Sequence, residues 1–106
     1  MQIPADAIIP REKLTQCLLV PRARNDKSRF LARAGFSLEH PELLEAALRE
    51  LVTQNQALVE REDVYGRYLD VRGVLRGPRG TLDVVTVWIV LATNSECRFV
   101  TLKPAR

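Results

Sequence analysis

The fold of this chain is decided by residues 65–92, which read YGRYLDVRGVLRGPRGTLDVVTVWIVLA. Residues 65–76 alternate between apolar and polar side chains, which predicts a strand buried on one face. Residues 81–92 are rich in β-branched side chains and predict a second strand. The Gly-Pro-Arg-Gly sequence at 77–80 predicts the turn between them, so the stretch forms an antiparallel hairpin.

The residues after the hairpin extend the sheet. A turn at 93–96 precedes residues 98–103, which predict a third strand closed by Pro104. Because the strands follow one another along the chain, they predict an antiparallel meander.

The residues before the hairpin carry apolar side chains at helical spacing. The first predicted helix covers residues 11–19 and the second covers residues 27–34. The third opens at Pro41 and directs an apolar stripe from Leu44 to Leu58 inward.

The second helix has clear end signals. Asn25 or Asp26 is placed to cap its start, and Gly35 is placed to end it. Lys27 stands at its amino end, where backbone amides and the helix dipole favour an anion, so a phosphate is expected to dock there. The alternative is that Lys27, next to Asp26, is an ordinary surface charge.

The order of elements predicts an α+β fold with three N-terminal helices packed on one face of a C-terminal antiparallel β-meander of three or more strands. The helical part covers about residues 11–59, and the sheet part about residues 64–104. A length of 106 residues predicts a single domain, 1–106.

The composition excludes several classes of protein. With 46% hydrophobic and 27% charged residues, the chain is typical of a globular protein, and it has no apolar run long enough to span a membrane. No secretory signal is found at the N-terminus, so a cytoplasmic location is expected. The two cysteines, Cys17 and Cys97, lack the spacing of a metal site, so we expect both to be core residues. We expect the protein to use no metal and no cofactor.

The strand pattern also predicts which side chains face away from the helices. The most apolar set of the middle strand is assigned to the helical face and includes Val85, Val87, Ile89 and Leu91. In the last strand, Val100 and Leu102 are predicted to point inward. The residues left for the open face are Tyr68, Asp70, Arg72, Val84, Thr86, Trp88, Phe99, Thr101 and Lys103. An indole on a solvated sheet is unusual, and the alternative is that Trp88 belongs to the core.

The net charge of +3 comes from clustered basic residues, most of them arginine. One group comprises Arg22, Arg24, Lys27, Arg29 and Arg33, and the other comprises Arg67, Arg72, Arg76 and Arg79. Either group could face a polyanion, since the guanidinium fork suits phosphate. The alternative is that both groups are ordinary charges on a solvated surface.

Several short motifs resemble a known family. In the helical part they are Lys13-Leu14, Leu18-Leu19-x-Pro21 and Asp26-Lys27-Ser28-x-Phe30-Leu31. In the sheet part they are Gly77-Pro78-x-Gly80, Val85-Thr86-Val87-Trp88 and Phe99-Val100-Thr101. Over nearly the whole chain they resemble a small uncharacterised bacterial domain found alone and at the C-terminus of polymorphic or contact-dependent toxins. The order of helices and strands is similar to that of the barnase, EndoU, colicin and RelE class of metal-independent RNases.

The resemblance implies a toxin-like endoribonuclease that binds RNA, such as tRNA, on the open sheet face and is neutralised by a small cognate protein. The catalytic candidates are Lys27, Arg72, Thr86, Thr101 and Lys103. The candidates for RNA binding are Arg22, Arg24, Arg29, Tyr68 and Trp88, with an aromatic ring stacking an unpaired base. Asp70 is a possible base, or the partner of Arg72 or Arg98 in a cross-strand pair.

Two features favour a different function. Toxin forms of the domain carry Asn-Pro-x-His where this chain has Val20-Pro21-Arg22-Ala23, and a basic residue at the position of Val85. The only histidine, His40, precedes Pro41 and is expected at a helix start. The alternative is a catalytically inactive module of the same fold that binds a protein partner.

Overall fold

The computed structural model describes residues 1–24 and 26–105. Its elements are, in chain order, α1 (Arg11–Lys13), the π-helix η1 (Leu14–Leu18), α2 (Ser28–Ala32), α3 (Pro41–Gln54), β1 (Ala57–Asp63), β2 (Gly66–Gly77), β3 (Gly80–Leu91) and β4 (Cys97–Pro104). The strands form one antiparallel sheet in the order β1-β2-β3-β4. The fold is therefore α+β, with the helices preceding a meander, as the sequence predicts.

The first strand, β1, was not predicted. The third helix ends at Gln54 instead of continuing to Leu58, so the helical part does not reach residue 59. Asn55 adopts an extended conformation, and its side-chain amide donates a hydrogen bond to the Leu51 carbonyl (2.8 Å). Leu58 lies in β1 and is 71% exposed, so it does not belong to the apolar stripe of α3.

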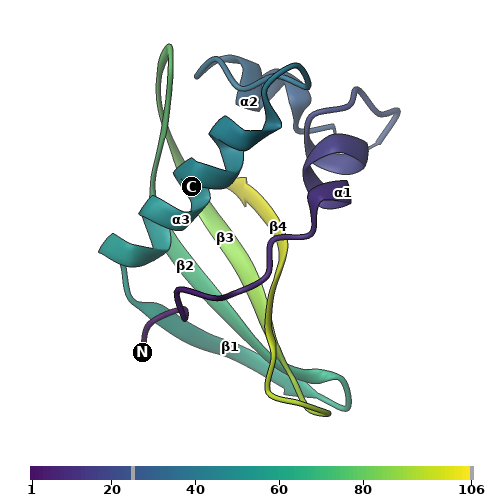
Figure 1. Ribbon diagram of the computed structural model, residues 1–106, viewed down its shortest axis with the longest axis vertical. Coiled ribbons are helices and arrows are strands. Elements are labelled where there is room, and N and C mark those ends of the chain that lie inside the picture. Colours follow the sequence, from purple (N-terminus) through teal and green to yellow (C-terminus); the bar gives the residue numbers. More distant parts are fainter. Residues whose placement is uncertain (25, 106) are drawn as a thin grey trace.

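The three helical regions do not cover the sheet equally. Helix α3 lies across the sheet, whereas α1 and α2 lie to one side of it (Figure 1). The predicted first helix is a single α-turn continued by η1, and α2 has only five residues. All three still contribute to one core, which contains Leu14, Leu31 and Leu48.

The predicted end signals of α2 flank a helix that is shorter than predicted, Ser28–Ala32 instead of residues 27–34. The Asp26 carboxylate accepts hydrogen bonds from the backbone N–H (2.9 Å) and hydroxyl (2.6 Å) of Ser28, the first residue of the helix, but the N-cap position belongs to Lys27, whose side chain makes no capping bond. Asn25 lies outside the described residues. Gly35 has a φ of +91°, the left-handed conformation expected of a residue that ends a helix.

The N-terminal segment crosses the helical face of the sheet and ties its two edges together (Figure 1). At one edge, the Met1 carbonyl accepts a hydrogen bond from the Ala57 N–H of β1 (2.7 Å). At the other edge, Ile8 forms an isolated parallel bridge with Arg98 of β4. Ile3 is buried along this path, so the segment is part of the core.

The register of the central hairpin corrects the predicted sides of β3. Gly77 pairs with Gly80 across a two-residue turn, so odd-numbered residues of β2 stand opposite even-numbered residues of β3. Leu69 and Val71 point toward the helices as predicted, and their partners must point the same way. The residues of β3 on the helical face are therefore Val84, Thr86 and Trp88, which are fully buried. Their placement on the open face was wrong.

Phe99 was also assigned to the wrong face. A register shift lies between Val87, which pairs with Thr101, and Trp88, which pairs with Phe99, so that Val100 is the extra residue of a β-bulge. Phe99 is 1% exposed, and its ring meets that of Trp88 edge to face, with 5.3 Å between centroids. Leu102 points inward as predicted, whereas Val100 lines a hollow on the open face.

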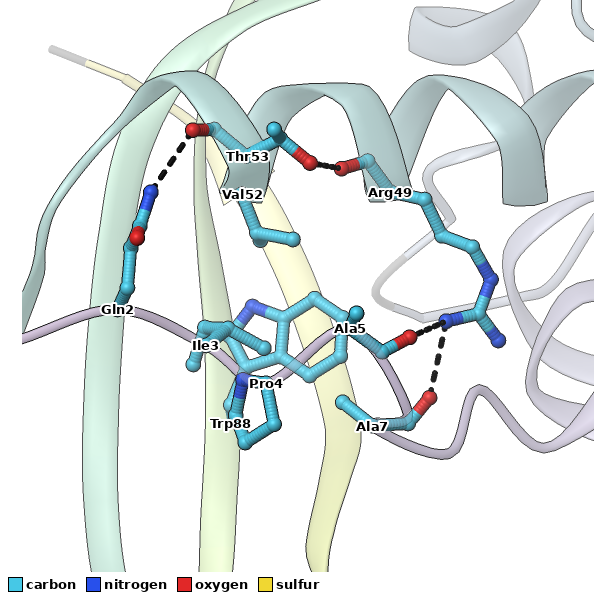
Figure 2. Close-up of a pocket in the computed structure, with 9 residues that line it drawn as sticks. All are labelled: Gln2, Ile3, Pro4, Ala5, Ala7, Arg49, Val52, Thr53 and Trp88. Carbon is cyan, nitrogen blue, oxygen red and sulfur yellow. Dashed lines mark hydrogen bonds between the residues drawn. The ribbon is translucent and has the colours of Figure 1, made fainter.

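The Trp88 indole is enclosed between the sheet and the elements above it. Figure 2 shows Val52 of α3 above the ring and Ile3 and Pro4 of the N-terminal segment beside it. Its Nε1–H donates a hydrogen bond to Thr86 Oγ1 (2.9 Å), and the Thr86 hydroxyl donates to the Val71 carbonyl (3.0 Å). This chain of bonds satisfies the polar groups that Trp88 and Thr86 bring into the core.

The Thr86→Val variant tests this chain of bonds. Valine keeps the shape of the side chain but leaves the buried Trp88 N–H without its acceptor and removes the hydroxyl's bond to the Val71 carbonyl. We expect the free energy of unfolding to fall by about 1–3 kcal/mol in urea denaturation. The matched control is Thr81→Val, on an exposed position of the same strand, which should change it by less than about 0.5 kcal/mol. Equal effects of the two substitutions would contradict the role given to the hydroxyl.

Candidate functional site

The face of the sheet turned away from α3 forms a trough along β3. Its floor consists of Val85 and Val87, both partly exposed, and its walls are polar side chains of β2 and β4. Residues paired across β2, β3 and β4 form two rows that cross the trough. One row is Asp70, Val87 and Thr101, and the other is Arg72, Val85 and Lys103. Since adjacent strands lie about 4.8 Å apart, the walls are separated by about 10 Å.

Two of the hollows on this face follow one another along the trough. The first, of about 380 Å³, is lined by residues of all four strands, among them Glu60, Tyr68 and Thr101. The second, of about 400 Å³, is lined by Arg72, Val85, Lys103 and Pro104. Lys103 lines both hollows. Its ammonium is therefore placed to meet a group that spans the two.

Lys27 reaches this face from the segment before α2. Its Nζ donates a hydrogen bond to Thr101 Oγ1 at 3.2 Å, although the two residues are far apart in the sequence. Burial lowers the pKa of Lys27 below its ordinary value, and the charges of Arg22 and Lys103 lower it further. The three cations therefore lie within electrostatic reach of one another on the β4 side of the trough, where an anion would relieve their repulsion.

Asp70 stands on the opposite wall. Burial raises its pKa above the ordinary value of 3.8, and the charge of Glu60 adds to the rise, while Lys103 opposes it. Of the two arginines predicted as its partners, Arg98 pairs instead with Glu96. A carboxyl with a raised pKa is a better proton acceptor than an ordinary carboxylate, and at this position it faces the cations across the valine floor.

The structure brings together six of the predicted site residues and separates four. The six around the trough are Arg22, Lys27, Tyr68, Arg72, Thr101 and Lys103. Thr86 and Trp88 lie on the other face of the sheet, under α3, so neither is presented to a ligand on the trough. Arg24 and Arg29 are exposed near α2, and within the described part of the chain no contact joins either to the trough.

Two residues of this face were missed by the sequence analysis. Glu60 and Arg61 lie in β1, and the Arg61 guanidinium stacks on the Tyr68 ring, with 3.7 Å from Cζ to the ring centroid. The sequence ALVERED has no clear alternation and is exposed along almost its whole length, so no periodic signal marks it as a strand. Its place in the sheet depends on pairing with β2.

The other residue types that often carry catalysis lie elsewhere. Burial raises the pKa of the Cys97 thiol to about 11, so this thiol is protonated at neutral pH. His40 lies at the start of α3, as predicted, and contacts Glu42 (3.2 Å).

Within residues 1–24 and 26–105, no three His, Cys, Asp or Glu side chains are grouped to hold a metal ion. In the same residues, no helix combines the length and apolar character needed to cross a membrane.

The fold and the trough define an α+β domain with one covered and one uncovered sheet face. A family model, for the domain of unknown function DUF6883, matches residues 4–106, and the chain belongs to this family. No curated protein and no solved structure matches the chain.

The Asp70→Asn variant tests the electrostatics of the trough. Because folding raises the pKa of Asp70, the native protein loses stability as the pH rises through the range in which this carboxyl ionises. Asparagine removes that loss, so we expect the free energy of unfolding at pH 7 to increase by less than about 1 kcal/mol. Below about pH 2.5, where the carboxyl is protonated in both states, this difference between the two proteins should disappear.

The control for this measurement is Asp83→Asn, an exposed carboxylate on the same face of the sheet. It should change stability less than Asp70→Asn does across the same pH series. A lower stability of Asp70→Asn at pH 7 would mean that Asp70 makes a favourable ion pair.

Proposed function

We propose that the domain binds single-stranded RNA along the trough and cleaves it without a metal ion. The observation that carries the proposal is the hydrogen bond from Lys27 Nζ to Thr101 Oγ1, beside Lys103 and across the trough from Asp70. A phosphodiester placed over the valine floor would have cations on one side and a proton acceptor on the other. These are the groups that metal-free RNA cleavage requires.

The proposed reaction uses the ribose 2′-hydroxyl as nucleophile. Asp70 takes the 2′-hydroxyl proton, the 2′-oxygen bonds to phosphorus, and the bond from phosphorus to the 5′-oxygen breaks. The leaving 5′-oxygen receives a proton from the Lys27 ammonium, and the products are a 2′,3′-cyclic phosphate and a 5′-hydroxyl. Lys103 stabilises the negative charge on the phosphorane. The raised pKa of Asp70 and the lowered pKa of Lys27 both favour these proton transfers.

The base-stacking part of the proposal rests on Tyr68 in place of Trp88. Tyr68 is half-buried in the hollow of the open face, while the indole is enclosed on the other side. Tyr68 and the guanidinium above it form a flat surface of the kind on which unpaired bases stack.

The experiment is cleavage of a labelled oligoribonucleotide by the purified protein in excess chelator at low salt. We expect products that end in a 2′,3′-cyclic phosphate, and a rate at least about 100-fold lower for Asp70→Asn and for Lys27→Met. The matched control is Arg67→Ala, an exposed cation of β2 on the opposite face, which should retain the rate.

Two further measurements complete the test. An oligonucleotide with 2′-deoxyribose at the cleaved position must stay intact, since it lacks the nucleophile. Binding to the deoxy substrate should weaken steeply with salt, because phosphate contacts release counterions. RNA left intact at micromolar protein, in the absence of any inhibitor protein, would refute the proposal.

A second candidate function is supported by a different surface. Four of the exposed large apolar residues lie on β1 and on the turn that follows it, namely Leu58, Val59, Val64 and Tyr65. β1 is an edge strand, so it offers unpaired backbone groups next to these side chains. We propose this β1 edge as the place where a small cognate protein adds a strand, either to neutralise the RNase or, in an inactive module, as the main function.

Co-expression with the protein encoded next to it tests this candidate. We expect a 1:1 complex that Val59→Asp and Val64→Asp disrupt, while Lys27→Met leaves it intact. A complex lost in Lys27→Met but kept in the β1 variants would place the partner on the trough instead. Growth arrest on expression of the domain alone, relieved by the partner, would distinguish a neutralised toxin from an inactive module.

A further inference from the structure

The hollow that contains Tyr68 and Asp70 lies between two β-bulges. In β1, the register shifts between Val59 and Arg61, and in β4 it shifts opposite Val87 and Trp88. The two irregularities are at the same level of the sheet, because Leu69 pairs with Val59 on one side and with Trp88 on the other. Bulges of this kind re-aim side chains and are frequent beside functional sites.

Each bulge directs an additional side chain to the open face. In a regular strand, Glu60 and Arg61 would point to opposite faces. Here Arg61 pairs with Tyr68 and stacks on its ring, while Glu60 lines the hollow beside Asp70. In β4, Val100 and Thr101 line the same hollow. The bulges therefore gather an acceptor, a flat cation and apolar contacts around one space of about 380 Å³.

The Arg61 guanidinium is held over the Tyr68 ring before any ligand binds. Its Cζ lies 3.7 Å from the Tyr68 centroid, and its Nη1 donates to Asp63 Oδ2 at 2.9 Å. The guanidinium is thus fixed over the ring, beside the hollow that it lines. Because its charge is paired with Asp63, it does not pair with Glu60, whose carboxylate is exposed.

The chemistry of Glu60 distinguishes between bases. A carboxylate only accepts hydrogen bonds, and its two oxygens match two donors side by side. Among the four RNA bases, only guanine has two adjacent donors, N1–H and the N2 amino group, on its Watson–Crick edge. Adenine and cytosine have one donor beside an acceptor, and uracil has one donor between two acceptors. That edge is free only in an unpaired base.

We propose that this hollow is a guanine-binding subsite, in which Arg61 stacks the base and Glu60 reads its Watson–Crick edge. The inference rests on the proposed function, because it places the guanosine on the 5′ side of the cleaved bond. Its 2′-hydroxyl then lies toward Asp70, and its 3′-phosphate toward Lys103, which lines both hollows of the trough. The substrate class is single-stranded RNA with accessible guanines.

Binding of the four nucleoside 3′-monophosphates tests the subsite without any cleavage step. We expect guanosine 3′-monophosphate to bind at least about tenfold more tightly than the uridine compound. Glu60→Gln should reduce this preference to within about threefold, and Arg61→Leu should weaken all four ligands alike. The matched control is Glu62→Gln, an exposed carboxylate of the same strand that does not line the hollow. Thermal melting of Glu60→Gln checks that it folds.

The outcomes separate this inference from the proposed function. Cleavage after guanine, with tight binding of the guanosine compound, supports both. Cleavage with equal binding of all four nucleotides refutes the guanine subsite and leaves the RNase proposal in place. No cleavage together with selective guanosine binding refutes the RNase proposal alone. No cleavage and no nucleotide binding refutes both.

Discussion

The two-residue turn between Gly77 and Gly80 is the constraint on which the rest of the molecule depends. A turn this short pairs odd-numbered residues of β2 with even-numbered residues of β3 and leaves no other register. Once Leu69 and Val71 point toward α3, Trp88 and Thr86 must point there as well. The indole then needs a partner for its N–H, which the Thr86 hydroxyl supplies within the same strand.

The same register determines what remains on the uncovered face. With Leu82, Val84, Thr86 and Trp88 of β3 in the core, Val85 and Val87 form the floor between β2 and β4, and polar side chains of the two neighbouring strands form the walls. The two bulges bring additional side chains to one level of this trough. A single covered face therefore accounts both for the stability of the domain and for the shape of its candidate site.

The electrostatics of the trough are unfavourable for the isolated protein. Asp70 lies near Glu60, and Lys27 lies near Arg22 and Lys103, so like charges are held together on each side. Groups arranged in this way reduce stability and are typical of sites that bind or transform a ligand. A phosphodiester would neutralise the cations, and a base that donates hydrogen bonds would engage the carboxylate of Glu60.

The sequence by itself determined the α+β class, the order of helices and strands, the hairpin, the left-handed Gly35 after α2 and the polar set of β2, because these depend on spacing and on local turn chemistry. It also placed Lys27, Thr101 and Lys103 among the candidates. Only the tertiary structure decided the face of Trp88, the strand β1 and the position of Glu60 and Arg61. These depend on strand register and on bulges, which arise from pairing between distant segments and leave no periodic signal in the chain.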